Sequence, residues 1–182
     1  MHWEFEPGHT AAGFRCRHMM VTWVGGHFKN IQGSLEFDPE RPAESSFQAT
    51  IDANALWTGD SARDEHLRSP DFLDTAKHPH ILFQSSGVEV LAPNEFRAHG
   101  NLILRGVTRS VPLEVRYCGQ WQTPYWEDGA DKGPVIRAGF SAAAVINRHH
   151  FEVNWNSTLD RGGLVVGDEV FIEIDVEALH WP

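Results

Sequence analysis

Apolar and polar residues alternate along most of the chain with a period of two. Successive side chains of a β-strand point to opposite faces, so this period is typical of strands that bury one face and expose the other. In the first clear run, Arg15 and Arg17 interrupt the apolar row. The residues on the inward face of that run are Phe14, Cys16, His18 and Met20. Four later rows follow the same pattern: Phe47, Ala49 and Ile51; Val111, Leu113, Val115 and Tyr117; Ala138, Phe140, Ala142 and Ala144; and Val170, Ile172, Ile174 and Val176.

Residues that favour turns separate these rows. The expected turn positions are Gly25-Gly26, Asp38-Pro39, Pro93-Asn94 and, just before the last strand, Gly167-Asp168. Eight or more strands with hairpin-length connections are typical of an antiparallel barrel or sandwich, and not of alternating strands and helices. The sequence therefore predicts an all-β fold.

Two segments depart from the period of two. Residues 60–73 contain helix formers, with Ser61 and Asp64 at the spacing of a capping box and Pro70 placed to end the first turns. We expect a short helical connection there, lying across one end of the barrel. Residues 121–133 are rich in Pro, Gly and Asp, which predicts a long hairpin loop instead of continuous strand, with its aromatic side chains folded back on the barrel.

The composition is that of one globular domain spanning residues 1–182. The net charge of −10 disfavours nucleic acid and anionic lipid head groups as partners. No stretch approaches the ~18 apolar residues of a membrane span, and the first residues do not resemble an export signal. We therefore expect a cytoplasmic protein without stable membrane insertion. A homodimer formed through the outer face of the barrel is left open.

Histidine and tryptophan are unusually frequent, with 11 His and 7 Trp beside 2 Tyr and 3 Met. His18 is expected to face inward, where an imidazole without a hydrogen-bond partner costs about 1–3 kcal/mol. It is a satisfied core residue, the polar anchor of a ligand cavity, or a metal ligand. His9 could approach the same end of the barrel. Cys16 and Cys118 are predicted to lie on opposite faces of the sheet, as two free thiols.

The predicted helix supplies a second set of polar candidates. Arg63 and His66 are three residues apart and so share one helical face. They form either a solvated surface with local ion pairs or a site at the barrel mouth for an anionic or polar head group. Arg148, just past the row of small residues, could join them.

Small residues around Ala142 leave volume inside the barrel unless Trp and Phe side chains from other strands fill it. A small eight-stranded barrel can be filled by side chains or hold one ligand. Burying ten methylene groups of a lipid tail would contribute about 8 kcal/mol before ordering costs are subtracted. A lipid tail could therefore bind there without a strong polar contact.

Common catalytic motifs are absent: the chain has no G-x-S-x-G, P-loop, H-E-x-x-H or strand-linked G-x-G-x-x-G. Adjacent residues on a strand face opposite ways, so His149 and His150 cannot chelate one metal from regular β-structure. No cofactor is expected. The alternative to a binding protein is an enzyme or metal-dependent catalyst that uses cavity histidines on a small aromatic or quinone-like substrate. A third possibility is a filled barrel that acts as an interaction module.

A series of spaced motifs resembles, in order, the pattern of the YceI-like family. It opens with W-x-F-x-P-x-H-T-x-x-x-F-x-x-R-H, from Trp3 to His18. Later matches are Thr58-Gly59, Arg63-Asp64-x-His66-Leu67, Pro79-x-Ile81-x-Phe83-x-Ser85, the run from Gly100 to Arg109, Asn147-Arg148 and Val166-Gly167-Asp168-x-Val170. The resemblance implies an extended, antiparallel, eight-stranded lipocalin-like barrel with a helical segment around residues 60–73. It also implies a long apolar tunnel.

On this resemblance, we expect a protein that binds and sequesters or carries a long apolar amphiphile of the polyisoprenoid, isoprenoid quinone or fatty-acyl type. The residues expected around its tail are Phe14, Cys16, Met20, Phe47, Ile51, Phe140 and Ala142. Those expected at its polar end are His18, Arg63 and His66, with Arg148. Departures from the family pattern at residues 149–153 and in the loop near residue 125 bear on the identity of the ligand.

Overall fold

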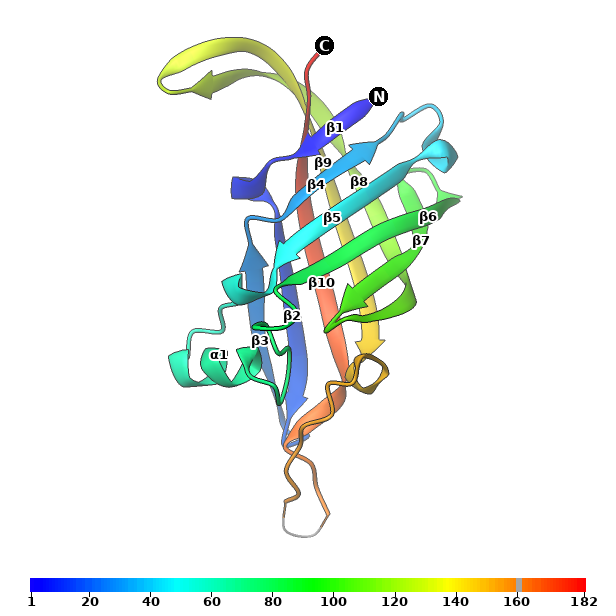
Figure 1. The fold of residues 1–182 in the computed structure, drawn as a ribbon. Helices are drawn as coiled ribbons and strands as arrows, with labels where there is room; N and C mark the ends of the chain where they lie inside the picture. Colours follow the sequence, from blue (N-terminus) through cyan, green and yellow to red (C-terminus); the bar gives the residue numbers. More distant parts are fainter. Residues whose placement is uncertain (160–161) are drawn as a thin grey trace.

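The computed structural model describes residues 1–159 and 162–182. In that part of the chain, ten strands form one antiparallel sheet in the order β1-β4-β5-β6-β7-β8-β9-β10-β2-β3. An additional pairing of β1 with β10 closes a barrel of eight strands (Figure 1). The strands are β1 (His2–Phe5), β2 (Ala11–His18), β3 (Thr22–Lys29), β4 (Gln32–Glu36), β5 (Ser46–Asp52), β6 (His80–Ala92), β7 (Glu95–Leu104), β8 (Val107–Glu127), β9 (Ala130–Asn147) and β10 (Val166–His180). The predicted all-β, eight-stranded antiparallel barrel is confirmed.

The N-terminal segment closes the barrel by sharing one long strand. β1 pairs with the end of β10 at Ala178 and Leu179, whereas β2 pairs with the earlier part of β10, from Val166 to Asp175. The 3₁₀ helix η1 (Pro7–His9) turns the chain between β1 and β2. Closure gives β1 a neighbour on both sides, which removes the free edge that an open sheet would present there.

The hairpin between β2 and β3 is not made by the glycine pair. Met19 and Met20 have positive φ angles and form the turn, while Gly25 and Gly26 lie inside β3 and pair with residues of β2. A Cβ atom on Gly26 would lie 2.7 Å from a ring carbon of Phe14. The prediction of a turn at Gly25-Gly26 is therefore wrong, because the glycine is required by close packing and not by chain reversal.

Of the other three expected turns, two lie outside the strands as predicted and one lies within a strand. Pro93 and Asn94 separate β6 from β7 as predicted, and Asn94 has a positive φ of 64°. Asp38-Pro39 follows the end of β4, also as predicted. Gly167-Asp168 instead lies within β10, where the pairing with β2 shifts register between Val166 and Val170.

The expected helix is present as α1 (Ser61–Arg68), which lies beside the barrel (Figure 1). Its N-cap is Asp60, whose carboxylate accepts hydrogen bonds from the main-chain N–H groups of Ala62 and Arg63. Asp64 does not serve a capping box; it is buried and accepts hydrogen bonds from Thr58. No helix among the described residues has the length and apolar character to cross a membrane.

The longest hairpin extends well beyond the barrel (Figure 1). β8 and β9 stay paired as far as Glu127 and Ala130, so residues 121–133 are largely strand and the loop prediction is wrong. Pro124 and Pro134 face each other across the two strands. Since proline has no main-chain N–H, both missing hydrogen-bond donors fall at the same pair of the ladder. Trp121 is 79% exposed, so this ring does not fold back on the barrel.

Candidate ligand cavity

An apolar cavity of about 310 Å³ lies inside the barrel. Its wall includes residues of two hydrophobic clusters, one containing Phe28 and Phe72 and the other containing Phe37 and Phe96. The cavity therefore extends along the barrel from the α1 end toward β1. An apolar space of this size falls at the lower end of the range of small-molecule sites, which is about 300–1,000 Å³.

Most of the residues expected around a ligand line this cavity. They are Phe14 and Cys16 from β2, Phe47 and Ile51 from β5, Phe140 and Ala142 from β9, and Arg148 at the start of η4 (Arg148–Phe151). The inward row of β10 predicted from Val170 to Val176 also lies on the wall. The period of two thus located the strand residues among them on the inner face, and contact of all these side chains with a ligand stays a prediction.

Two residues at the end of β2 lie off the cavity wall. Met20 is 50% exposed and belongs to the turn, because β2 ends at His18. His18 is partly buried and pairs with Thr22 and Val166 at the barrel end, beyond the cavity lining. The prediction that the inward row continues to Met20 is wrong, since the chain reverses there.

Arg63 and His66 are held within their own segment. The Arg63 Nε atom donates to Thr58 Oγ1 at 2.9 Å, and the Nη2 atom donates to the main-chain oxygen of Thr58. The His66 ring lies 2.9 Å from Asp71 and packs edge-on against Phe72, which itself lines the cavity. Neither Arg63 nor His66 is on the cavity wall, and their contact with the polar end of a ligand stays a prediction.

Arg148 closes the α1 end of the cavity as a buried guanidinium. Its side chain donates to four main-chain oxygens, those of Val153, Trp155, Val166 and Gly167. Burial lowers the pKa of Arg148, while the carboxylate of Asp168, 3.9 Å away, raises it. Through these four hydrogen bonds, Arg148 links η4 and the segment after it to β10.

The two cysteines are free, as expected. The Cys16 thiol donates to the main-chain oxygen of Gly167 at 3.2 Å, and burial raises the pKa of Cys16. Cys118 is exposed. A neutral thiol on the cavity wall behaves as a small apolar side chain.

Ser45 is a cavity residue that sequence patterns do not reveal. It follows the short 3₁₀ helix η2 (Pro42–Glu44), outside any strand, so no alternation marks it. Ser45 is one of the residues that line the cavity, and its hydroxyl oxygen is buried without a hydrogen-bond partner among the described residues. The hydroxyl of Thr10, also on the wall, is instead engaged by the main chain of Glu177. Ser45 is thus a cavity residue whose hydroxyl the described residues leave without a partner.

A closed antiparallel barrel around an apolar internal cavity defines the class of lipocalin-like binding folds. The sequence pattern of the YceI-like domain matches residues 3–178. The chain belongs to the YceI-like family, as the spaced motifs indicated.

Two relatives show the same extent of similarity. A UPF0312 protein of Enterobacter sp. strain 638 is 36% identical over 175 residues, which are 96% of this chain and 83% of the relative. Protein YceI of Salmonella newport strain SL254 is 35% identical over 175 residues, which are 96% of this chain and 84% of the relative. The similarity therefore extends across nearly the whole chain.

Solved structures share the fold at lower identity. BcnA of Burkholderia cenocepacia superposes with a TM-score of 0.75 at 24% identity, covering 92% of this chain and 95% of BcnA. A YceI protein of Campylobacter jejuni gives 0.73 at 25% identity, with 91% and 90% covered. A polyisoprenoid binding domain from Saccharophagus degradans gives 0.63 at 15% identity, with 99% and 98% covered. All three share the barrel architecture.

Proposed function

We propose that this protein binds a long apolar amphiphile inside the barrel and sequesters or carries it. The amphiphile is of the polyisoprenoid, isoprenoid quinone or fatty-acyl type. The observation that carries the proposal is the internal cavity, whose wall is built almost entirely of aliphatic and aromatic side chains. Each methylene group buried there contributes about 0.8 kcal/mol, so affinity grows with the length of the tail.

Two further observations support the ligand class. The barrel shares its fold with a polyisoprenoid binding domain from Saccharophagus degradans. Ser45 lines the cavity and has a buried hydroxyl without a partner among the described residues, so this residue is our candidate for contact with a polar end group. In contrast, no histidine of the described residues lies on the cavity wall, so the alternative of a catalyst built from cavity histidines gains no support there.

The proposal is tested by extracting the purified protein with organic solvent and analysing the extract by mass spectrometry. A long-chain amphiphile should be recovered in a fixed ratio to protein. Extracted protein should then take up an added prenol or fatty acid. Absence of lipid from the extract, together with failure to take up either probe, would contradict the proposal.

A further inference from the structure

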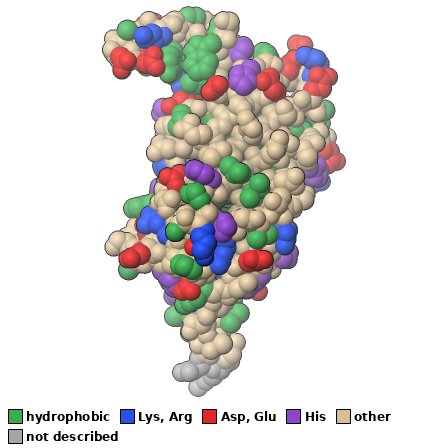
Figure 2. All heavy atoms as spheres, in the orientation of Figure 1, with side chains coloured by type: hydrophobic (Ala, Val, Ile, Leu, Met, Phe, Trp, Pro, Cys, Tyr) green, Lys and Arg blue, Asp and Glu red, His purple; other side chains and the backbone are tan. Residues whose placement is uncertain are grey.

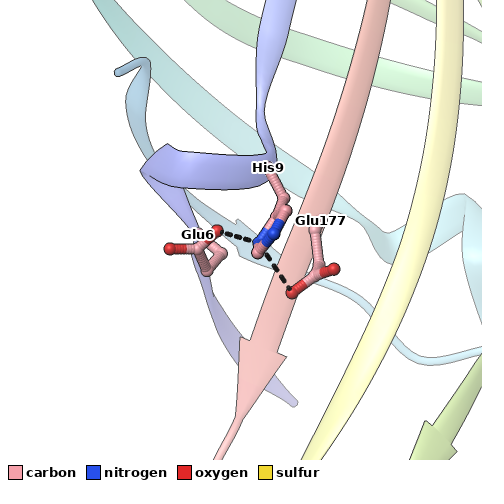
Figure 3. Close-up of side chains that lie close together, drawn as sticks. All are labelled: Glu6, His9 and Glu177. Atoms are coloured by element: carbon pink, nitrogen blue, oxygen red, sulfur yellow. Dashed lines mark ion pairs between the residues drawn. The ribbon is translucent and has the colours of Figure 1, made fainter. Parts of the chain in front are cut away.

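Glu6, His9 and Glu177 form a polar cluster that the barrel function does not use. Their ligand atoms all lie within 4.8 Å of one another, and none of the three residues lines the cavity (Figure 3). Glu6 is the N-cap of η1, His9 is the last residue of η1, and Glu177 belongs to β10. The cluster therefore joins the turn after β1 to the strand that closes the barrel.

The main chain holds these residues in place independently of their mutual contacts. The main-chain N–H of Glu6 donates to the main-chain oxygen of Glu177 at 2.8 Å. Thr10 exchanges two hydrogen bonds with the main chain of Glu177, and Glu6 Oε1 accepts a hydrogen bond from the N–H of Gly8. The fold thus sets the main-chain positions of Glu6 and Glu177 and one oxygen of the Glu6 carboxylate, which favours a preorganised site.

Both carboxylates converge on one nitrogen of the His9 ring (Figure 3). The Nδ1 atom lies 2.5 Å from Glu6 Oε2 and 3.8 Å from Glu177 Oε1. Glu6 Oε2 is buried, yet it has no partner that meets hydrogen-bond geometry, in spite of this short approach. One nitrogen and two carboxylate oxygens are thus close enough together to act as ligands of a single ion.

Other histidines of the described residues contact carboxylates differently. In His2, Nδ1 lies 2.6 Å from Glu36 and Nε2 lies 3.3 Å from Glu4, so each ring nitrogen has its own acceptor. His149 likewise divides its two ring nitrogens between Asn154 and Asp168. That division is the arrangement expected of a hydrogen-bonded imidazole. At His9, in contrast, both carboxylates approach the same ring nitrogen, Nδ1.

The cluster keeps a negative charge in spite of a neighbouring guanidinium. Arg137 forms an ion pair with Glu177 and so neutralises one of the two carboxylates. With a neutral His9, the group of four carries a net charge of −1. His9 is 69% exposed, so one side of the cluster is open to solvent. Imidazole nitrogen together with carboxylate oxygen is a donor set that suits zinc and related divalent transition metals.

We propose that Glu6, His9 and Glu177 form a surface binding site for a divalent transition-metal ion of the zinc class. The three side chains supply one nitrogen and two carboxylate groups, and water completes the coordination on the exposed side. The site lies on the outer wall, so metal binding and lipid binding are separate properties of the chain.

Isothermal titration of the metal-free protein with zinc chloride tests the proposal. The wild type should bind one equivalent in a saturable step, and His9→Gln should weaken that step at least tenfold. Glu6→Gln should weaken it as well, while it keeps an acceptor for the N–H of Gly8. His2→Gln is the matched control, because it removes an exposed histidine that also contacts two glutamates, and it should leave binding unchanged.

Cobalt(II) provides a second measurement on the same variants. Bound cobalt should give a visible absorption band in the wild type and in His2→Gln, and the band should be lost in His9→Gln. Circular dichroism establishes that each variant is folded. Equal zinc affinity of the wild type and His9→Gln, or equal losses in His9→Gln and His2→Gln, would overturn the assignment.

Discussion

Ser45 lines the apolar cavity, and its buried hydroxyl has no hydrogen-bond partner among the described residues. A buried polar group without a partner costs about 1–3 kcal/mol. Other polar side chains on the wall, among them Cys16 and Arg148, are bonded to main-chain oxygens. A hydroxyl or carbonyl on the ligand that reaches Ser45 recovers this cost in the complex, so this single residue is expected to orient the amphiphile.

Replacing Ser45 by alanine should abolish discrimination between a prenol and the hydrocarbon of the same chain length. We expect the wild type to prefer the prenol by about fivefold, because one neutral hydrogen bond contributes about 1 kcal/mol. Ser45→Ala should bind the two probes equally. Competition against a fluorescent fatty acid measures both affinities.

The neighbouring Ser46 provides the control for this experiment. Its side chain is exposed, so Ser46→Ala should keep the preference for the prenol. If Ser45→Ala retained the wild-type preference, the polar end of the ligand would have to lie elsewhere in the cavity.

At the scale of elements, the β2–β3 hairpin depends on a close approach at Gly26. A Cβ atom there would lie 2.7 Å from Phe14 and from Thr58, and 2.8 Å from the main-chain oxygen of Trp57. Trp57 also bridges to His27 in β3. The segment before α1 thus packs directly on β3, and only a residue without a side chain allows that contact.

Gly26→Ala should destabilise the fold by about 1–3 kcal/mol, because overpacking forces neighbouring groups to move. Urea denaturation followed by circular dichroism measures the free energy of unfolding. Gly87→Ala in β6 is the control, since a Cβ atom at Gly87 would meet nothing within 4 Å. Equal stability of the two variants would show that the packing at Gly26 is looser than the structure indicates.

At the scale of the whole molecule, the barrel separates an apolar interior from a charged exterior. Acidic, basic and histidine side chains are spread over the face seen in Figure 2, including the tip of the β8–β9 hairpin. Within β9, Ala142 faces the cavity and its neighbour Ala143 faces outward. Adjacent positions on one strand therefore belong to different functional surfaces.

This separation predicts opposite results for two similar substitutions. Ala142→Phe should reduce uptake of a fatty acid at least tenfold, because the ring occupies the cavity, and unfolding should change by less than about 1 kcal/mol, because the space is available. Ala143→Phe should leave uptake unchanged. A fluorescent fatty acid measures uptake, and a loss of about 1–3 kcal/mol in Ala142→Phe would indicate a filled barrel instead.

The sequence predicted features that depend on neighbouring residues in the chain better than features that depend on contacts between distant segments. The period of two correctly placed Phe14, Phe47 and Phe140 on the inner face, because strand geometry is local and repeats at every residue pair. It failed at Met20, where the chain reverses. In the long hairpin, pairing between β8 and β9 overrode the turn preference of Pro and Gly.

The sequence by itself determined the strand faces, the short helix and the family, since each is encoded in local pattern or in the order of motifs. Only the tertiary structure decided which polar groups are free to act. Arg148 is buried and bonded to main-chain oxygens of segments that the fold brings to it. The hydroxyl of Ser45 is buried where no such partner approaches it. Hydrogen-bond satisfaction depends on such long-range neighbours, and the spacing of residues along the chain does not specify them.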